Sequence, residues 1–133
     1  MPIDFSFSQE VEDARLMMRG FLQDTVKPAF AALQADKDAQ RADWSALVKS
    51  LRQKAKAQGF WLPHMPQDVG GMGLGVTALA AVSAEAAKIP MGPYIINAQA
   101  PDEGNMHTLY HFATDYQREH FLKPLLEGTA RCC

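Results

Sequence analysis

The chain has 133 residues, of which 47% are hydrophobic and 21% are charged, and its formal net charge is −2. These values are typical of one globular domain with a single core, and the charge gives no reason to expect nucleic acid as a partner. No apolar run approaches the roughly 20 residues of a membrane-spanning helix, and the acidic N-terminus lacks the basic region of a signal or transit peptide.

The first expected helix runs from about Ser8 to Val26, because apolar residues recur there at the spacing of one helical face. Ser6, followed three residues later by Gln9, is the expected N-terminal capping box. Pro28 should end or kink this helix. The polar residues after it read as a helix end or a loop.

The second expected helix starts at the N-cap candidate Asp43 and stops before Gly59. Its inner face carries apolar residues from Trp44 to Ala55. Four basic residues lie largely outside that face: Lys49, Arg52, Lys54 and Lys56. They are interpreted as a solvated helix surface, with a docking face as the alternative.

The segment "PQDVGGMGLGV", from Pro66 to Val76, is either a nucleotide cradle or a turn between helices. Gly73, Gly75 and Ala78 fit the loose dinucleotide pattern, but that pattern needs a buried strand before it, and none is expected here. A phosphate-binding loop would need a following Lys-Ser/Thr pair, which is also missing. The segment is therefore interpreted as a structural turn.

The turn leads into a third expected helix, from Val76 to about Ala87. Its residues are small and apolar nearly all round, so the helix should be central and closely packed. Glu85 is its only ionisable residue. An irregular connection with three prolines follows, and connections of this length are often functional.

Two shorter helices are expected at the end. One follows the cap candidates Asp102 and Asn105, and the other begins at the capping box from Thr114 to Gln117, with Gly128 closing it. No stretch alternates with a period of two, so no sheet is expected. The fold prediction is all-α, a bundle of about five helices.

The residues offer no self-sufficient reactive site. His107 and His111 have the i, i+4 spacing of metal ligands, but nothing supplies a third ligand. Asp102 and Glu103 are adjacent and point apart. The neighbouring Cys132 and Cys133 are expected to be reduced thiols inside a cell. We therefore assign no catalytic, metal-binding or cofactor-binding residue to this chain.

Several motifs in order resemble the N-terminal helical domain of acyl-CoA dehydrogenases, from Phe5 to Cys132. They are "GFWLP", "PQDVGGMGLG", "APDEGNM" and "LKPLLEGTARC". The most specific piece is the glycine turn, which comprises Pro66, Gly70, Gly71, Gly73 and Leu74. The "PDEGNM" form is similar to the branch of the family that uses longer or branched substrates.

The resemblance implies a subunit of three parts, in which this helical domain precedes a middle β-domain and a C-terminal helical domain. In that family FAD lies between the latter two parts and the neighbouring subunit. A glutamate of the C-terminal part removes the α-proton of the acyl-CoA while the β-hydride passes to FAD. Residues 1–133 would stop where the β-domain begins, so the fragment alone should be non-catalytic and bind no FAD.

What the resemblance implies for this chain is a wall of the acyl pocket. The segment that corresponds to it comprises Asn97, Ala98, Gln99, Pro101, Asp102, Gly104, Asn105 and Met106. Its small residues leave room, and Met106 would offer a soft apolar contact. Excluding water there would favour a carbanion-like transition state. Packing of an ordinary loop is the alternative interpretation of these residues.

The expected partners are those of the family: an acyl-CoA substrate, an electron-transfer partner and further copies of the subunit. The expected compartment is the bacterial cytoplasm, or the mitochondrial or peroxisomal matrix in a eukaryote. The alternative hypothesis is a stand-alone helical module that binds an acyl chain or a protein partner without redox chemistry. The isolated chain is also expected to self-associate or to be only marginally stable, because it would expose faces that normally pack on other domains.

Overall fold

The computed structural model describes residues 6–133, and its regular secondary structure in this range is helical. The predicted all-α fold is confirmed. Phe5, where the family resemblance begins, lies outside the described residues. None of the described helices has both the length and the hydropathy that a bilayer crossing requires.

Five longer helical segments account for most of the described chain. The first is a rod of α1 (Gln9–Phe21), a π-helical turn η1 (Leu22–Val26) and α2 (Lys27–Ala35). Single helices follow: α3 (Arg41–Ala57), α4 (Val76–Ala86) and α6 (Asp102–Phe112). The last segment joins α7 (Asp115–Gln117), a π-helical turn η3 (Arg118–Leu122) and α8 (Lys123–Glu127). A 3₁₀ turn η2 (Gln67–Val69) and the short α5 (Gly92–Ile95) complete the set.

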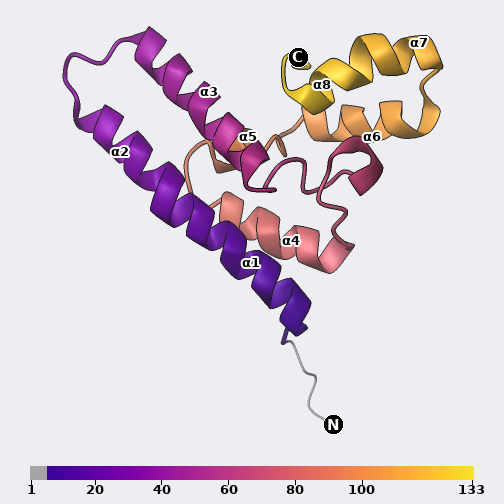
Figure 1. The fold of residues 1–133 in the computed structure, drawn as a ribbon, viewed down its shortest axis with the longest axis horizontal. Helices are drawn as coiled ribbons and strands as arrows, with labels where there is room; N and C mark the ends of the chain where they lie inside the picture. Colours follow the sequence, from indigo (N-terminus) through magenta and orange to yellow (C-terminus); the bar gives the residue numbers. More distant parts are fainter. Residues whose placement is uncertain (1–5) are drawn as a thin grey trace.

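Figure 1 shows the α1–α2 rod along one side of the molecule, with α3 returning beside α2. Helix α4 packs against α1, and α6 with α7–α8 forms a helical hairpin at the other end. One apolar cluster joins these elements. Its fully buried members include Met18, Leu51, Met65, Val82 and Met106.

Of the two outcomes predicted for Pro28, an end or a kink, the structure excludes the end, since the helical segment continues through it. The π-helical turn η1 precedes it, and Pro28 takes the second position of α2. Proline lacks an N–H group and its ring crowds the carbonyl four residues earlier, so a widened turn lets the rod continue. The same arrangement recurs where η3 precedes Pro124 at the start of α8.

Four predicted caps are also wrong, each by a few residues. Helix α1 begins after Ser8, whose Oγ accepts a hydrogen bond from the Val11 N–H at 3.4 Å, rather than after Ser6. Asp43 is the third residue of α3, where its carboxylate accepts from the N–H of Gln40, the actual N-cap, at 2.8 Å. In α6 the N-cap is Pro101, so that Asp102 is the first helical residue and Asn105 lies inside the helix.

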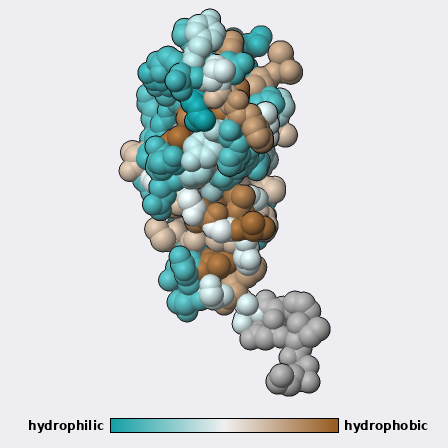
Figure 2. All heavy atoms as spheres, turned by 90° about the vertical axis from the view of Figure 1, so that its right-hand side faces the viewer, coloured by the Kyte–Doolittle hydropathy of each residue, from teal (hydrophilic) through white to brown (hydrophobic). Residues whose placement is uncertain are grey.

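Helix α4 is not surrounded by other elements, contrary to the prediction. Its buried residues are Ala78, Ala81, Val82, Glu85 and Ala86, which face α1 and the core. The opposite side is open, and Val76 at its start is 86% exposed. Figure 2 shows hydrophobic residues gathered in patches on the face formed by the ends of α4, α6 and α7. At the end of α6, Phe112 is 83% exposed.

Candidate functional site

The glycine turn folds back on the loop that precedes it. Gly70 and Gly73 have positive φ values of 84° and 66°, a conformation that glycine adopts without strain. A Cβ at Gly71 would collide with the backbone carbonyl of Met65, so only glycine allows this approach. Leu74 packs on the core cluster at the end of the turn. The turn thus leads directly into α4, which begins at Val76.

The turn does not have the geometry of a phosphate or flavin cradle. A cradle needs free backbone N–H groups aimed at the ligand. Here the N–H groups of the four residues from Gly70 to Gly73 donate to the carbonyls of Gln67, Pro66, Leu62 and Met65, at 2.9 to 3.2 Å. With these four donors satisfied internally, the stretch from Gly70 to Gly73 offers no N–H group to a cofactor phosphate.

The eight predicted pocket-wall residues lie in three different environments. Pro101, Gly104 and Asn105 are exposed, whereas Ala98 and Gln99 are half-buried. Asn97, Asp102 and Met106 are buried, and Met106 belongs to the core cluster with no exposed surface. The role of this set as a pocket wall stays a prediction.

Two of the buried residues, Asn97 and Asp102, tie this segment to the C-terminal one. Asn97 Nδ2 donates to the carbonyl of Leu125 at 2.9 Å. Asp102 accepts from Arg131 Nε and from the Cys132 N–H, both at 2.7 Å. Residues 97–102 are therefore held in place by the side chains of Asn97 and Asp102, although the sequence predicted an irregular connection before α6.

A hollow of about 380 Å³ lies beside α6. Asn105 is the member of the predicted set that lines it, together with Leu109, Phe121 and Leu125. Its walls are mainly apolar, a character suited to a hydrocarbon chain.

His64 is the buried polar side chain without a partner. Both ring nitrogens lie below the surface, and neither has a hydrogen-bond partner among the described residues. Its ring meets that of His107 edge-on, with centroids 5.4 Å apart. Burial lowers the pKa of His64 to about 4, with a smaller contribution from His107, so the ring is neutral at pH 7.

Metal binding is not indicated by the arrangement of these side chains. No group of three or more potential His, Cys, Asp or Glu ligands comes together among residues 6–133. The His64–His107 contact was not predicted, because the two rings are brought together only by the fold.

Arg52 is the functional candidate that sequence reasoning placed wrongly. It was assigned to the solvated face of α3, but it is 8% exposed and donates to the Tyr94 carbonyl at 2.5 Å and to Asn97 Oδ1 at 3.2 Å. The signal was present: Arg52 follows Trp44 and Val48 at steps of four, the spacing of one helical row.

Comparisons with known proteins agree with this architecture. A family model described as "Acyl-CoA dehydrogenase, N-terminal domain" matches residues 8–129. The chain is 34% identical, over 97% of its length, to probable acyl-CoA dehydrogenase FadE2 of Mycobacterium tuberculosis. It is 28% identical, over 93% of its length, to acyl-CoA dehydrogenase family member 11 of Rattus norvegicus.

A solved structure, assigned as an acyl-CoA dehydrogenase of Mycobacterium abscessus, superposes on 96% of this chain with a TM-score of 0.81 and 28% identity. The chain covers 34% of that structure, 32% of the M. tuberculosis protein and 16% of the rat protein. It therefore spans about a third or less of these relatives. Its match over residues 8–129 shows that the chain belongs to the acyl-CoA dehydrogenase family, as an N-terminal domain.

Proposed function

We propose that this chain is the N-terminal part of an FAD-dependent acyl-CoA dehydrogenase and contributes a wall of its acyl pocket. The observation that carries the proposal is the family match over residues 8–129, together with relatives named acyl-CoA dehydrogenases that it covers in part. By the same proposal the flavin and the base would be held by other parts of the subunit, and the N–H groups of Gly70 to Gly73 are already occupied within the turn.

The contribution of this domain would be shape and exclusion of water. The apolar hollow beside α6 offers a surface for a hydrocarbon chain, and Asn105 stands at its wall. Asn97 and Asp102 hold the preceding segment rigidly against the C-terminal residues. A wall fixed in this way would keep water from the reacting carbons without moving a proton itself.

The exposed apolar residues support a domain that packs on further parts of a subunit. Val76 and Phe112 are each more than 80% exposed, which is costly for large hydrophobic side chains in one patch. An oligomeric assembly, an electron-transfer partner and a bacterial cytoplasmic location belong to the same proposal.

The direct test is to purify the protein encoded by its gene and measure intact mass, flavin absorbance and acyl-CoA-dependent reduction of a dye. A mass well above 14.7 kDa, a flavin spectrum and dye reduction are expected. A colourless 133-residue product that reduces no dye would refute the catalytic proposal and leave the stand-alone binding module.

The wall is tested in the active protein by Asn105→Trp, which fills the hollow from an exposed position. We expect the KM for a long-chain acyl-CoA to rise about tenfold while that for a short-chain substrate stays unchanged, since lost apolar contacts of about 1.4 kcal/mol correspond to this factor. An equal effect on both substrates would show that Asn105 does not line the acyl pocket.

A further inference from the structure

A second and larger cavity lies along α3. This groove of about 1250 Å³ is lined by one continuous face of the helix, from Arg41 to Lys56 at steps of three and four residues. That face is about 22 Å long at 1.5 Å per residue. Residues of α2 and of the segments 90–99 and 127–131 form the remaining walls, and they include Gln99 of the predicted pocket wall. Arg131 lines both this groove and the hollow beside α6.

The groove is basic, although the chain as a whole is acidic. Its lining contains five basic residues and one carboxylate, that of Glu127. The complete chain has 13 basic and 15 acidic residues. The basic lining residues are Arg41, Lys49, Arg52, Lys56 and Arg131. A groove of one sign concentrates ligands of the opposite charge.

Two aromatic rings hold three of these cations together. The Trp61 ring carries the Arg52 guanidinium at 4.7 Å and the Lys56 ammonium at 4.4 Å from its centroid. The Tyr94 ring carries Arg52 and Arg131, each at 4.5 Å. Arrangements of this kind fix a cation by attraction to the face of the ring. The order Lys56–Trp61–Arg52–Tyr94–Arg131 is therefore a preformed ladder of alternating cations and rings.

Arg52 and Lys56, the two cations of the ladder that belong to α3, have no carboxylate partner among the described residues. The ion pairs of this part of the chain include Arg131 with Asp102, but neither Arg52 nor Lys56. Lys56 Nζ instead donates to the backbone carbonyl of Glu127 at 2.5 Å.

Burial, followed by Arg131, lowers the pKa of Arg52, and burial, followed by Arg52, lowers that of Lys56. The fold thus brings like charges together, which an anion would stabilise.

The other end of the groove is aromatic. Phe30 of α2 and Trp44 of α3 line it and stack on each other, with centroids 6.1 Å apart and planes at 21°. Trp44 and Arg52 are eight residues apart on α3, or about 12 Å along the axis. The groove therefore offers a flat apolar surface at a fixed distance from the cation ladder.

We propose that the α3 groove binds an organic anion, with its carboxylate or phosphate at Arg52 and Lys56 and its apolar or aromatic body directed toward Trp44. This proposal does not rest on the acyl-CoA dehydrogenase activity proposed above. Arg52 and Lys56 are held by their hydrogen bonds to the carbonyls of Tyr94 and Glu127, and their remaining N–H groups would donate to the charged group. The body would be covered by the stacked rings.

The test is a calorimetric titration of the protein encoded by the gene with decanoate, with ADP and with inorganic phosphate. The Lys56 and Lys54 variants described below assign the measured binding to this groove. We expect saturable binding of decanoate or ADP that weakens as salt is added. A response to decanoate alone assigns a hydrocarbon body, and a response to ADP alone assigns an aromatic one.

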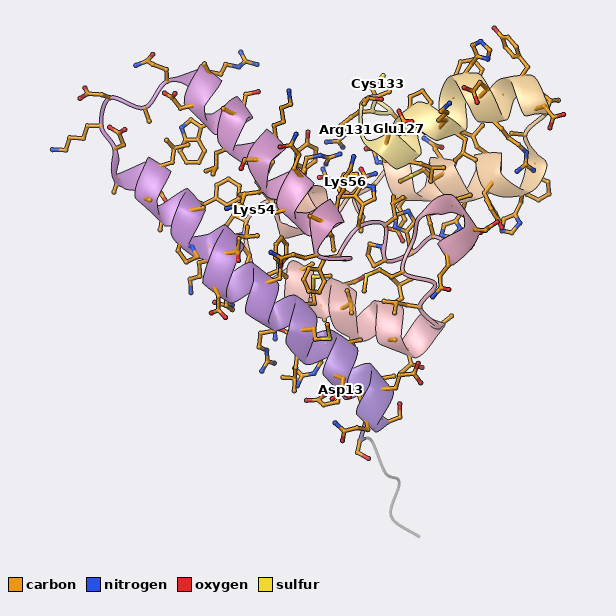
Figure 3. The ribbon with its side chains drawn as sticks, viewed as in Figure 1. Asp13, Lys54, Lys56, Glu127, Arg131 and Cys133 are labelled. Carbon is orange, nitrogen blue, oxygen red and sulfur yellow. The ribbon has the colours of Figure 1, made fainter. Side chains whose placement is uncertain are left out.

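Lys56→Gln should weaken that binding about tenfold, the order expected for loss of one charge-assisted hydrogen bond. The matched control is Lys54→Gln, which removes the same charge from an exposed residue of α3 outside the groove lining. Figure 3 shows Lys54 on the side of α3 toward the α1–α2 rod, and Lys56 beside Glu127 and Arg131. Thermal unfolding of both variants verifies that each is folded.

Three results would overturn the proposal. The first is no saturable response to decanoate or ADP at millimolar concentration. The second is an equal loss of binding in Lys54→Gln and Lys56→Gln, which would indicate a general charge effect. The third is inorganic phosphate binding as tightly as both larger probes, which would remove the role of the rings at Trp44.

Discussion

Replacing Glu85 by glutamine removes a buried negative charge at the contact between α1 and α4. Glu85 is 4% exposed. Its carboxylate accepts from Arg15 Nη1 at 2.6 Å, from Arg19 Nη2 and Nε at 2.7 and 3.1 Å, and from Lys88 Nζ at 2.9 Å. Glutamine has nearly the same volume, so the substitution tests the charge rather than the packing.

The size of the effect follows from the pKa of this carboxyl. Hydrogen bonds from Arg19, then Lys88 and Arg15, lower it from 4.5 to about 2, against the opposing effect of burial. That difference corresponds to about 3 kcal/mol at most. Arg19 and Lys88 are partly exposed, and water screens their charges, so we expect a loss of about 2 kcal/mol in the free energy of unfolding.

The assay is urea unfolding of both proteins between pH 7 and pH 2. With a slope of about 2 kcal/mol per molar, the midpoint of Glu85→Gln should lie about 1 M lower at pH 7. A carboxyl whose pKa is lowered on folding stabilises the protein above its unfolded pKa, and this stabilisation is lost as pH falls through the folded value. The difference between the two proteins should therefore be complete above pH 4.5 and shrink toward pH 2.

A matched control is Glu119→Gln. Glu119 also pairs with a cation, Lys123 at 2.6 Å, but both side chains are more than half exposed. Exposed pairs of this kind contribute little, so its unfolding midpoint should not change measurably. Equal effects of the two substitutions, or a Glu85→Gln difference that is the same at pH 7 and pH 3, would refute the reasoning.

Three further predictions concern the turn, the orphan histidine and the exposed face. Gly71→Ala should lower the free energy of unfolding, measured in urea, by more than about 2 kcal/mol, because its Cβ would meet the backbone of Met65. Gly75→Ala, with open space around it, should change this free energy little. Equal losses in the two variants would contradict the turn geometry. The wild-type free energy of unfolding should fall as pH falls from 6.5 toward 4, because His64 stays neutral in the folded protein but is protonated in the unfolded one. His64→Phe should remove this pH dependence. The same pH dependence in both proteins would contradict the explanation. Sedimentation velocity should show concentration-dependent association that Phe112→Ser and Val76→Ser reduce; a wild-type monomer at every concentration would contradict it.

Periodicity predicted where the helices are, because burial of one face repeats every three to four residues regardless of the neighbour that covers it. Local patterns were less informative about interruptions. Pro28 was predicted to end or kink the first helix, yet it lies within a continuous helical segment after a π-helical turn, as Pro124 does in the last segment. A π-helical turn widens the helix only locally. The apolar residues before and after each proline therefore stay packed on the core.

A sequence motif locates a segment but not its contacts. The segment 97–106 was singled out from the sequence as a pocket wall, and that role stays a prediction. The structure adds that Asn97 and Asp102 bond to residues 125–132. The partners lie about 30 positions away in sequence, and no spacing rule joins them. The same limit hid the cation ladder, in which α3 meets Trp61 and Tyr94 only after folding.

Helix α4 shows why composition alone misjudged burial. A run of alanines has no strong apolar face, so the sequence does not indicate which side is covered. In the structure, Ala78 and Ala81 lie on the side that faces α1 and the core, where small side chains permit close approach. That closeness also buries Glu85 between Arg15 and Arg19, so a charged residue replaces the further apolar contact that the sequence suggested. The contact between α1 and α4 is consequently both apolar and ionic, and the pH dependence of Glu85→Gln measures its ionic part.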